Sequence, residues 1–342
     1  MVQLTFPGWL TEQWARLPPP LYADLSGKTV VVTGANTGIG LEAAKHFARM
    51  KPAKLIVACR NEQKGVEALN HIAEKTGYVA ELHLVDYADF ASVKAFAERL
   101  KDVPIDIFVA NAAICETKFW LTKDGWEHVL QVNHLSTALL SFLLLPNLVK
   151  AAKEHNSHSR LVLVTSELHH MTEISEELRS APKGILRTMS DPEYCTPARF
   201  ARRYEETKIF VILFTRALAA HLGGGAVVPT AVNPGFCYTG LRKQLGLPTR
   251  ALMAAVDATV GRSAEQGARQ LLHAALGPDG ADGEHVEFFR GAYVSANAVR
   301  EPSDFVLSKA GKEVQDTVWS ETIDALGEVS LDVRRIVEEY LS

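Results

Sequence analysis

Short apolar runs alternate along the chain with stretches in which apolar residues recur at helical spacing. Five runs are typical of strands buried on both faces of a sheet: 28–33, 54–58, 81–85, 105–110 and 160–165. Between them, amphipathic helices are expected over 39–50, 63–76, 90–100 and 125–148. Strands that alternate with helices in this way form parallel sheets through right-handed crossovers. The pattern therefore predicts an α/β fold with a doubly wound parallel sheet and helices on both faces.

The same alternation continues in the second half of the chain. We expect a helix over 204–221, a strand over 227–233, a helix over 264–275 and a last strand near 291–296, which gives about seven strands. No linker or repeat interrupts the pattern, so we predict a single domain over 1–342. It would comprise an N-terminal extension (1–25), a core (26–300) and a C-terminal helical extension (301–342).

Two long segments do not fit the alternation, namely 167–203 and 236–262. Each begins where a strand is expected to end, which is the edge at which open α/β sheets bind ligands. We predict that they form an extended lid over a substrate pocket. Acidic and basic residues balance in the first segment, which favours an apolar substrate. Apolar residues that either line this pocket or only pack the lid onto the body are Leu168, Met171, Phe236, Tyr238, Leu245 and Leu247.

Composition narrows the class of protein. A net charge of -4 without a basic run gives no reason to expect nucleic acid or an anionic membrane as a partner. The four cysteines are widely spaced and suggest reduced thiols in the cytoplasm. The adjacent His169 and His170 would point to different sides, so no metal site is expected.

Membrane attachment has only a weak basis in the sequence. The first ten residues lack the charged start and apolar core of a signal peptide, and the most apolar stretch, 135–149, is too short to cross a bilayer. The aromatic N-terminal segment either touches a membrane or packs against the body of the protein, and we favour packing.

A glycine-rich turn follows the first predicted strand. Gly34, Gly38 and Gly40 allow a tight turn and bring a helix N-terminus close to a bound phosphate, where backbone N–H groups meet the negative charge. The turn lies between a strand and a helix, as a dinucleotide site requires.

The ends of the next three strands carry further candidates for this site. Arg60 follows the second strand, where a guanidinium can hold the 2′-phosphate of NADP; a carboxylate there would select NAD instead. Asp86 and Asn111 are placed to contact the adenine and a ribose, or alternatively only to cap the next segment. We expect NADP, with NAD as the alternative.

Tyr204 and Lys208 supply the candidate chemistry. Of the eight tyrosines, only Tyr204 has a lysine four residues later, one helical turn away on the same face. A phenol has a pKa of about 10, and a nearby ammonium lowers it by stabilising the phenolate. Ser166 lies where a strand ends and Asn133 lies in the long apolar helix pattern. Glu205 and Glu206 should lie off the catalytic face, in solvent.

Together these motifs resemble the short-chain dehydrogenase/reductase family over about Leu25 to Ala298, which implies a Rossmann fold. The retinol-dehydrogenase-like branch, or a fungal relative, is the most similar in its extensions and in the C-terminal Val318-Trp319-Ser320-Glu321. Asn133, Ser166, Tyr204 and Lys208 match the family's catalytic tetrad. The positions that match its cofactor-binding residues are Gly34, Asn36, Thr37, Gly38, Ile39, Gly40, Arg60, Asp86, Asn111, Ala112, Tyr204, Lys208, Pro234, Gly235 and Thr239. Ala113 replaces a glycine of the family.

The resemblance implies an NADPH-dependent reductase of a medium-sized apolar carbonyl, or an NADP-dependent dehydrogenase of the matching alcohol. It implies that Tyr204 acts as general acid or base, that Ser166 hydrogen-bonds the reacting oxygen, that Lys208 also holds the nicotinamide ribose, and that Asn133 holds a proton-supplying water. Relatives pair through the helices expected at 125–148 and 204–221, so a homodimer is possible unless the extensions cover them. The alternatives are a non-catalytic NADP-binding sensor or scaffold, and a sugar-nucleotide epimerase or dehydratase with a different glycine spacing.

Overall fold

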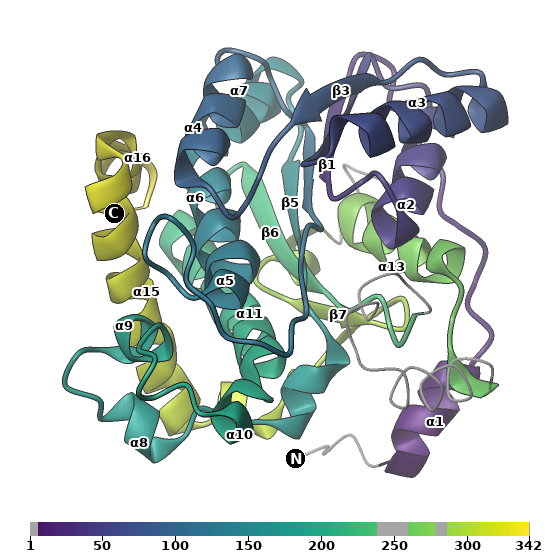
Figure 1. Ribbon diagram of the computed structural model, residues 1–342. Coiled ribbons are helices and arrows are strands. Elements are labelled where there is room, and N and C mark those ends of the chain that lie inside the picture. Colours follow the sequence, from purple (N-terminus) through teal and green to yellow (C-terminus); the bar gives the residue numbers. More distant parts are fainter. Residues whose placement is uncertain (1–5, 238–258, 278–285, 342) are drawn as a thin grey trace.

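The computed structural model describes residues 6–237, 259–277 and 286–341, and its centre is a sheet of eight strands (Figure 1). The strand order is β3-β2-β1-β4-β5-β6-β7-β8, with the first seven parallel and β8 antiparallel to β7. The strands are β1 (Thr29–Thr33), β2 (Lys54–Cys59), β3 (Glu81–Leu84), β4 (Ile107–Ala110), β5 (Ser159–Val164), β6 (Val227–Val232), β7 (Tyr293–Ser295) and β8 (Ala298–Arg300). The predicted doubly wound fold is confirmed.

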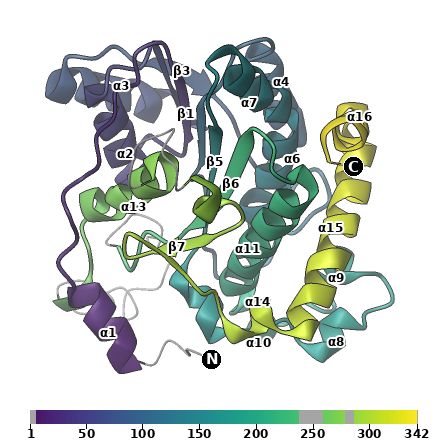
Figure 2. The same cartoon turned by 180° about the vertical axis from the view of Figure 1, so that it is seen from behind.

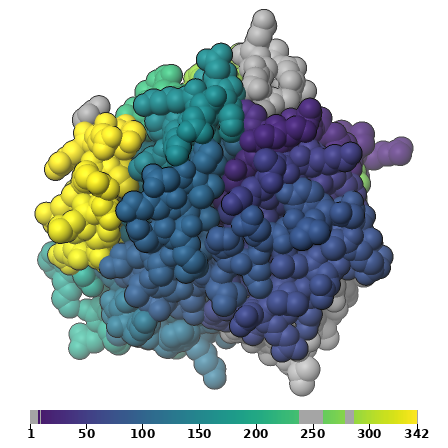
Figure 3. Space-filling view, turned by 90° about the horizontal axis from the view of Figure 1, so that it is seen from above, coloured from purple at the N-terminus to yellow at the C-terminus, as the bar shows by residue number. Residues whose placement is uncertain are grey.

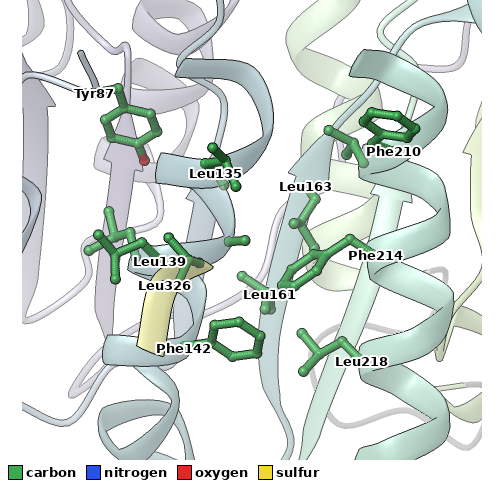
Figure 4. Close-up of a cluster of buried hydrophobic side chains, with 14 of the residues drawn as sticks. Tyr87, Leu135, Leu139, Phe142, Leu161, Leu163, Phe210, Phe214, Leu218 and Leu326 are labelled. Atoms are coloured by element: carbon green, nitrogen blue, oxygen red, sulfur yellow. The ribbon is translucent and has the colours of Figure 1, made fainter. Parts of the chain in front are cut away.

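Helices cover both faces of the sheet (Figures 1 and 2). One face carries α2 (Gly38–Arg49), α3 (Glu62–Thr76), α13 (Ala264–Leu276) and the short η4 (Val286–Phe289). The other carries α4 (Phe90–Arg99), α6 (Ser136–Leu143), α7 (Leu145–Glu154) and α11 (Arg203–Leu222). Each face has its own hydrophobic core, since alternate residues of the central strands point to opposite sides. Figure 4 shows part of the second core, where Phe142 and Phe214 meet Leu161 and Leu163 of β5.

Three details differ from the sequence-based expectation. The strand β3 is not buried on both faces, because it is the edge strand and its residues are exposed or half-buried. The expected helix at 125–148 is divided into α5 (His128–Leu130), a π-helical turn η1 (Gln131–Leu135), α6 and α7. The strand β8 was not predicted, and it returns through a hairpin in which Ala296 and Asn297 have positive φ.

No single helix in the described part of the chain is long and apolar enough to cross a membrane. The pair His128–Leu143 and Leu145–Glu154, bent by 43°, passes that test of length and composition only when the two are taken together.

The segment between β5 and α11 folds into four short helices beyond the carboxyl edge of the sheet (Figure 1). They are η2 (Glu167–Met171), α8 (Glu176–Arg179), α9 (Ile185–Met189) and α10 (Pro197–Phe200). The second predicted lid segment lies mostly outside the described residues, and only Phe236–Cys237 and 259–262 belong to the structure.

Both ends of the chain add helices to the core. The N-terminal α1 (Phe6–Trp14) lies beyond the carboxyl edge of the sheet (Figure 1). The C-terminal α14 (Asp304–Leu307), α15 (Lys309–Val329) and α16 (Leu331–Tyr340) pack along α11 and α6. In Figure 3 the yellow C-terminal residues form a continuous patch on one flank. Trp319 stacks on His221 of α11, with ring centroids 4.7 Å apart. The C-terminal helices therefore cover the surface through which a homodimer was considered possible.

Candidate active site

The candidate catalytic residues Tyr204 and Lys208 lie on the first turns of α11. The Lys208 Nζ atom lies 5.5 Å from the centre of the Tyr204 ring, so the two side chains are on the same side of the helix. Lys208 is 2% exposed, and its Nζ donates to the Val164 carbonyl at 2.8 Å. The hydroxyl of Thr165 in turn donates to the Lys208 carbonyl at 2.8 Å. These bonds fix the start of α11 against the end of β5, directly before Ser166.

Burial makes the Lys208 amine acidic. Removal from water penalises the ammonium form and lowers the pKa of Lys208 to about 7. A proton on this amine is therefore held weakly at neutral pH, and negative charge that develops nearby strengthens its hold.

Ser166 lies two residues after the end of β5, with extended backbone geometry. Its Oγ accepts the backbone N–H of Leu168 at 3.3 Å and so caps the η2 turn. A hydroxyl that accepts through a lone pair can still donate its proton, which leaves Ser166 able to bond a ligand oxygen.

Asn133 lies in the π-helical turn η1 and is 1% exposed. Its amide holds the backbone of Ile114, accepting from the N–H and donating to the carbonyl at 2.9 Å each, and also donates to the Thr207 hydroxyl at 3.1 Å. Thr207 donates to the Tyr204 carbonyl. Asn133 therefore joins the loop after β4 to the turn that carries Tyr204. Single π-turns inside α-helices often mark functional sites.

The glycine-rich turn has the backbone that the motif predicted. Gly34 and Gly38 have φ of 65° and 59°, a region that favours glycine. A Cβ on Gly40 would lie 2.5 Å from the Asn111 amide nitrogen and 2.6 Å from the Gly34 carbonyl oxygen, so no larger residue fits.

The N-terminus of α2 lacks the side-chain cap found at the N-termini of α3 and α4. Thr37 makes no side-chain cap there, whereas Asn61 caps α3 and Asp89 caps α4. A helix of this length with an uncapped start and a close-packed glycine approach fits the phosphates of a dinucleotide. Asn36 and Ile39 lie in the same turn.

The other predicted cofactor residues lie along the same edge of the sheet. Arg60 is exposed and directly follows β2. The Asp86 carboxylate accepts the N–H of Ala88 at 3.0 Å, and the Asn111 amide donates to the Thr33 carbonyl at 2.9 Å. The backbone N–H of Ala112 bonds the Thr33 hydroxyl at 3.3 Å. Asp86 therefore holds the backbone of its own loop, and Asn111 holds the end of β1.

The segment after β6 is built around buried Asn233, whose Oδ1 accepts from the N–H groups of Glu167 and Gly235 at 3.1 and 3.0 Å. Gly235, after Pro234, has a φ of 82°. Thr239 lies outside the described residues, as do Tyr238, Leu245 and Leu247.

Of the predicted pocket residues that are described, Leu168 and Phe236 are half-buried, while Met171 is 77% exposed. None of them lines the cavity of about 490 Å³ between α4, α7 and α16.

The expectation that Glu205 and Glu206 are solvated is wrong. The Glu206 side chain is 13% exposed and lies 3.5 Å from the guanidinium of Arg203, which is itself 3.5 Å from buried Glu127. Burial raises the pKa of Glu206 to about 7 and also raises the pKa of Glu205. Sequence reasoning missed this cluster because Glu127 is remote in the chain and the lid covers it.

The expectation that His169 and His170 point to different sides is wrong. Their rings lie against each other, with centroids 4.0 Å apart and planes tilted by 43°. Within the described residues, no group of three or more His, Cys, Asp or Glu side chains has the arrangement of a metal site.

Comparison with known proteins identifies the family. Residues 28–192 match the model for short chain dehydrogenases. The chain is 37% identical over 280 residues to the short chain dehydrogenase atnD of Emericella nidulans, a match covering 80% of this chain and 87% of that protein. The chain belongs to the short-chain dehydrogenase family. A short chain dehydrogenase of Alternaria solani, sol3, is 35% identical over 84% of this chain and 96% of its own length.

Solved structures share the fold of this short-chain dehydrogenase. A putative NAD(P)-dependent gluconate 5-dehydrogenase from Beutenbergia cavernae with bound NADP superposes with a TM-score of 0.57, at 24% identity over 83% of this chain and 99% of that one. L-sorbose reductase from Gluconobacter frateurii, complexed with NADPH and L-sorbose, has a TM-score of 0.57 at 19% identity, covering 79% and 96% of the two chains. The fungal relatives confirm the predicted affinity with fungal proteins. The family model itself covers only residues 28–192, so it leaves α1 unmatched and also α11, with Tyr204 and Lys208, and the rest of the chain after it.

Proposed function

We propose that this short-chain dehydrogenase is an NADP(H)-dependent oxidoreductase that interconverts a medium-sized apolar carbonyl compound and its alcohol. The observation that carries the proposal is the placement of Lys208. It is buried, hydrogen-bonded to Val164 at the end of β5, and lies on the same side of α11 as the Tyr204 ring. Ser166 follows two residues after Val164, so a proton donor, its tuning amine and a hydroxyl adjoin one strand end.

The residues would divide the chemistry as follows. A bound nicotinamide supplies or accepts the hydride. Tyr204 gives a proton to the carbonyl oxygen in reduction and takes it back in oxidation. Lys208 stabilises the phenolate that remains, and Ser166 donates a hydrogen bond to the same substrate oxygen. Asn133 fixes the turn beneath Tyr204 and, in the proposal, orients a water that renews the proton.

The preference for NADP rests on Arg60. It is exposed at the end of β2, and a planar guanidinium can bond a phosphate with two donors. Two proteins of the same fold were solved with NADP or NADPH. They show that this fold accommodates the phosphorylated cofactor, but the preference itself depends on Arg60.

We further propose a cytoplasmic monomer. No disulfide joins the four cysteines, all of which are described. The C-terminal helices cover α6 and α11, so the pairing considered from the sequence would require them to leave.

To test this, we would follow the loss of NADPH absorbance when the purified protein is mixed with each of a panel of apolar aldehydes and ketones. A matched panel of charged carbonyl compounds serves as the comparison. We expect turnover of apolar members and a clear preference for NADPH over NADH. Tight NADPH binding without turnover of any member would contradict the enzyme and favour the sensor. A preference for charged sugar nucleotides would favour the epimerase class.

A further inference from the structure

The turn that follows Ser166 is held by parts of the chain that are remote in sequence. It comprises Glu167–Met171, the helix η2, which begins the first predicted lid segment directly after Ser166. Two of its side chains, Glu167 and His169, are 7% and 0% exposed. Buried polar side chains of this kind are kept in place by hydrogen bonds, so their partners determine where the turn lies.

The partner of Glu167 is Gln13 of α1. The Gln13 Nε2 atom lies 3.2 and 3.1 Å from the two carboxylate oxygens of Glu167, and Gln13 is itself only 6% exposed. The Asn233 amide reaches the same carboxylate at 3.3 Å. A charge-assisted contact between two buried side chains is among the stronger hydrogen bonds.

Further bonds hold α1 at this position. The guanidinium of Arg262 donates to the Glu12 carbonyl at 2.5 Å, and the Trp14 indole N–H donates to the Thr259 carbonyl at 3.1 Å. Arg262 also packs on Gly235, where an added Cβ would lie 2.7 Å from its Nη1. The helix α1 therefore joins the Ser166 turn to the segment after β6.

The partner of His169 belongs to the C-terminal segment. The N–H of Ser303, which caps α14, donates to His169 Nε2 at 3.1 Å, so the ring proton is on Nδ1 and donates to the Ser166 carbonyl at 2.7 Å. Burial lowers the pKa of His169 to about 3, which keeps this ring neutral. The ring thus connects the backbone of Ser166 to the start of the C-terminal helices.

We propose that Gln13 and His169 are positioning residues, through which the N-terminal helix and the C-terminal segment fix the turn that aims Ser166 at the substrate. This rests on the proposed function, because Ser166 is the group being positioned. Neither residue touches the reacting atoms. Their effect should appear in the rate of the chemical step, while cofactor binding at the α2 turn stays unchanged.

The first variant is Gln13→Ala, with Gln63→Ala on exposed α3 as the matched control. Loss of a hydrogen bond to a buried carboxylate should lower kcat by about tenfold, with the Kd of NADPH unchanged. The control should match the wild type. A parallel loss of kcat and NADPH affinity would show general loosening of the fold and contradict the proposal.

A matched pair of variants tests His169. In His169→Asn the amide nitrogen takes the place of Nδ1 and keeps the bond to Ser166, whereas in His169→Gln the amide reaches the place of Nε2 and the Ser166 bond is lost. We expect the Asn variant to keep several-fold more kcat than the Gln variant. Equal activity, or a more active Gln variant, would contradict the role of the Ser166 contact.

Hydrogen–deuterium exchange over residues 165–171 gives a readout independent of turnover. Gln13→Ala should accelerate exchange there and leave residues 33–40 as in the wild type. If the wild type turns over no carbonyl but exchange in Gln13→Ala still accelerates, the proposed function is wrong, while the structural role of Gln13 in holding the turn is supported. Unchanged exchange together with unchanged kcat would contradict the positioning role of Gln13.

Discussion

The proposed cofactor side and the proposed substrate side of this molecule are built from different kinds of groups. The phosphate-binding part of the proposed cofactor side is backbone: Gly34, Gly38 and Gly40 form the turn, and the uncapped start of α2 would supply N–H groups. The substrate side consists of buried polar side chains from distant parts of the chain, such as Gln13 on Glu167.

The difference shows how each side can fail. A backbone site depends on a few positions where no side chain fits, so it fails through steric overlap. A site of buried polar side chains depends on matched partners, so it fails when one partner or its protonation changes.

Trp319→Ala tests whether the C-terminal helices are part of the stable fold. Its ring contacts Phe142, Phe214 and His221. Removing a packed tryptophan costs about 3–5 kcal/mol, and partial exposure places this one near the lower value. Urea unfolding should show that loss, against a smaller one for Trp120→Ala, whose ring is 43% exposed. Similar losses of unfolding free energy for the two variants would mean that the C-terminal helices contribute little to the stability of the core.

Glu206→Gln tests the buried charges of the substrate side. Burial raises the pKa of Glu206 from 4.5 to about 7, despite Arg203 and Arg202 and with Glu205 and Glu127 adding to the effect. The folded state therefore keeps a proton that the unfolded chain loses above pH 4.5, so this residue lowers stability as the pH rises to 7. The free energy of unfolding falls by about 3 kcal/mol in total between pH 4.5 and 7 because of this residue.

The variant lacks this titration. Its stability relative to the wild type should therefore rise by up to about 3 kcal/mol between pH 4.5 and 7.5, measured by urea unfolding at each pH. Glu338→Gln, at an exposed position of α16, should show no comparable trend. A flat difference for Glu206→Gln would mean that the carboxyl titrates as it does in water.

Gly40→Ala tests the backbone site. The added methyl would lie 2.5 Å from the Asn111 amide nitrogen. Overpacking of this kind costs about 1–3 kcal/mol, so NADPH should bind about 5- to 150-fold more weakly. Gly224→Ala, where an added Cβ meets nothing within 4 Å, is the control for titration calorimetry. Unchanged affinity would show that the turn tolerates a side chain.

Arg60→Ala should have the smallest effect, because the residue is exposed. We expect the Kd of NADPH to rise about tenfold while that of NADH stays the same, since one charge-assisted contact is lost. The control is Lys64→Ala, which removes an exposed cation of α3 and should alter the Kd of neither NADPH nor NADH. Equal effects on both cofactors would remove the basis for the NADP preference.

The same contrast explains what the sequence could predict. The parallel sheet and the glycine turn follow from local patterns, because strand hydrophobicity and glycine spacing are properties of short segments. The pairing of Tyr204 with Lys208 is also local, being one helical turn. By contrast, the burial of Glu206 and the contact of Gln13 with Glu167 depend on segments that meet only in the folded chain. The antiparallel β8 was missed because its residues are exposed or half-buried, unlike those of the equally short β7, and so form no apolar run.

The most direct test of the central claim compares Tyr204→Phe with the wild type and with Tyr340→Phe on α16. With NADPH and the best carbonyl substrate of the wild type, Tyr204→Phe should show no measurable turnover, while its NADPH affinity, measured by fluorescence titration, stays within about twofold because only the proton donor is removed. The control variant should keep full activity. Near-normal turnover by Tyr204→Phe would contradict the assignment of this hydroxyl as the proton donor.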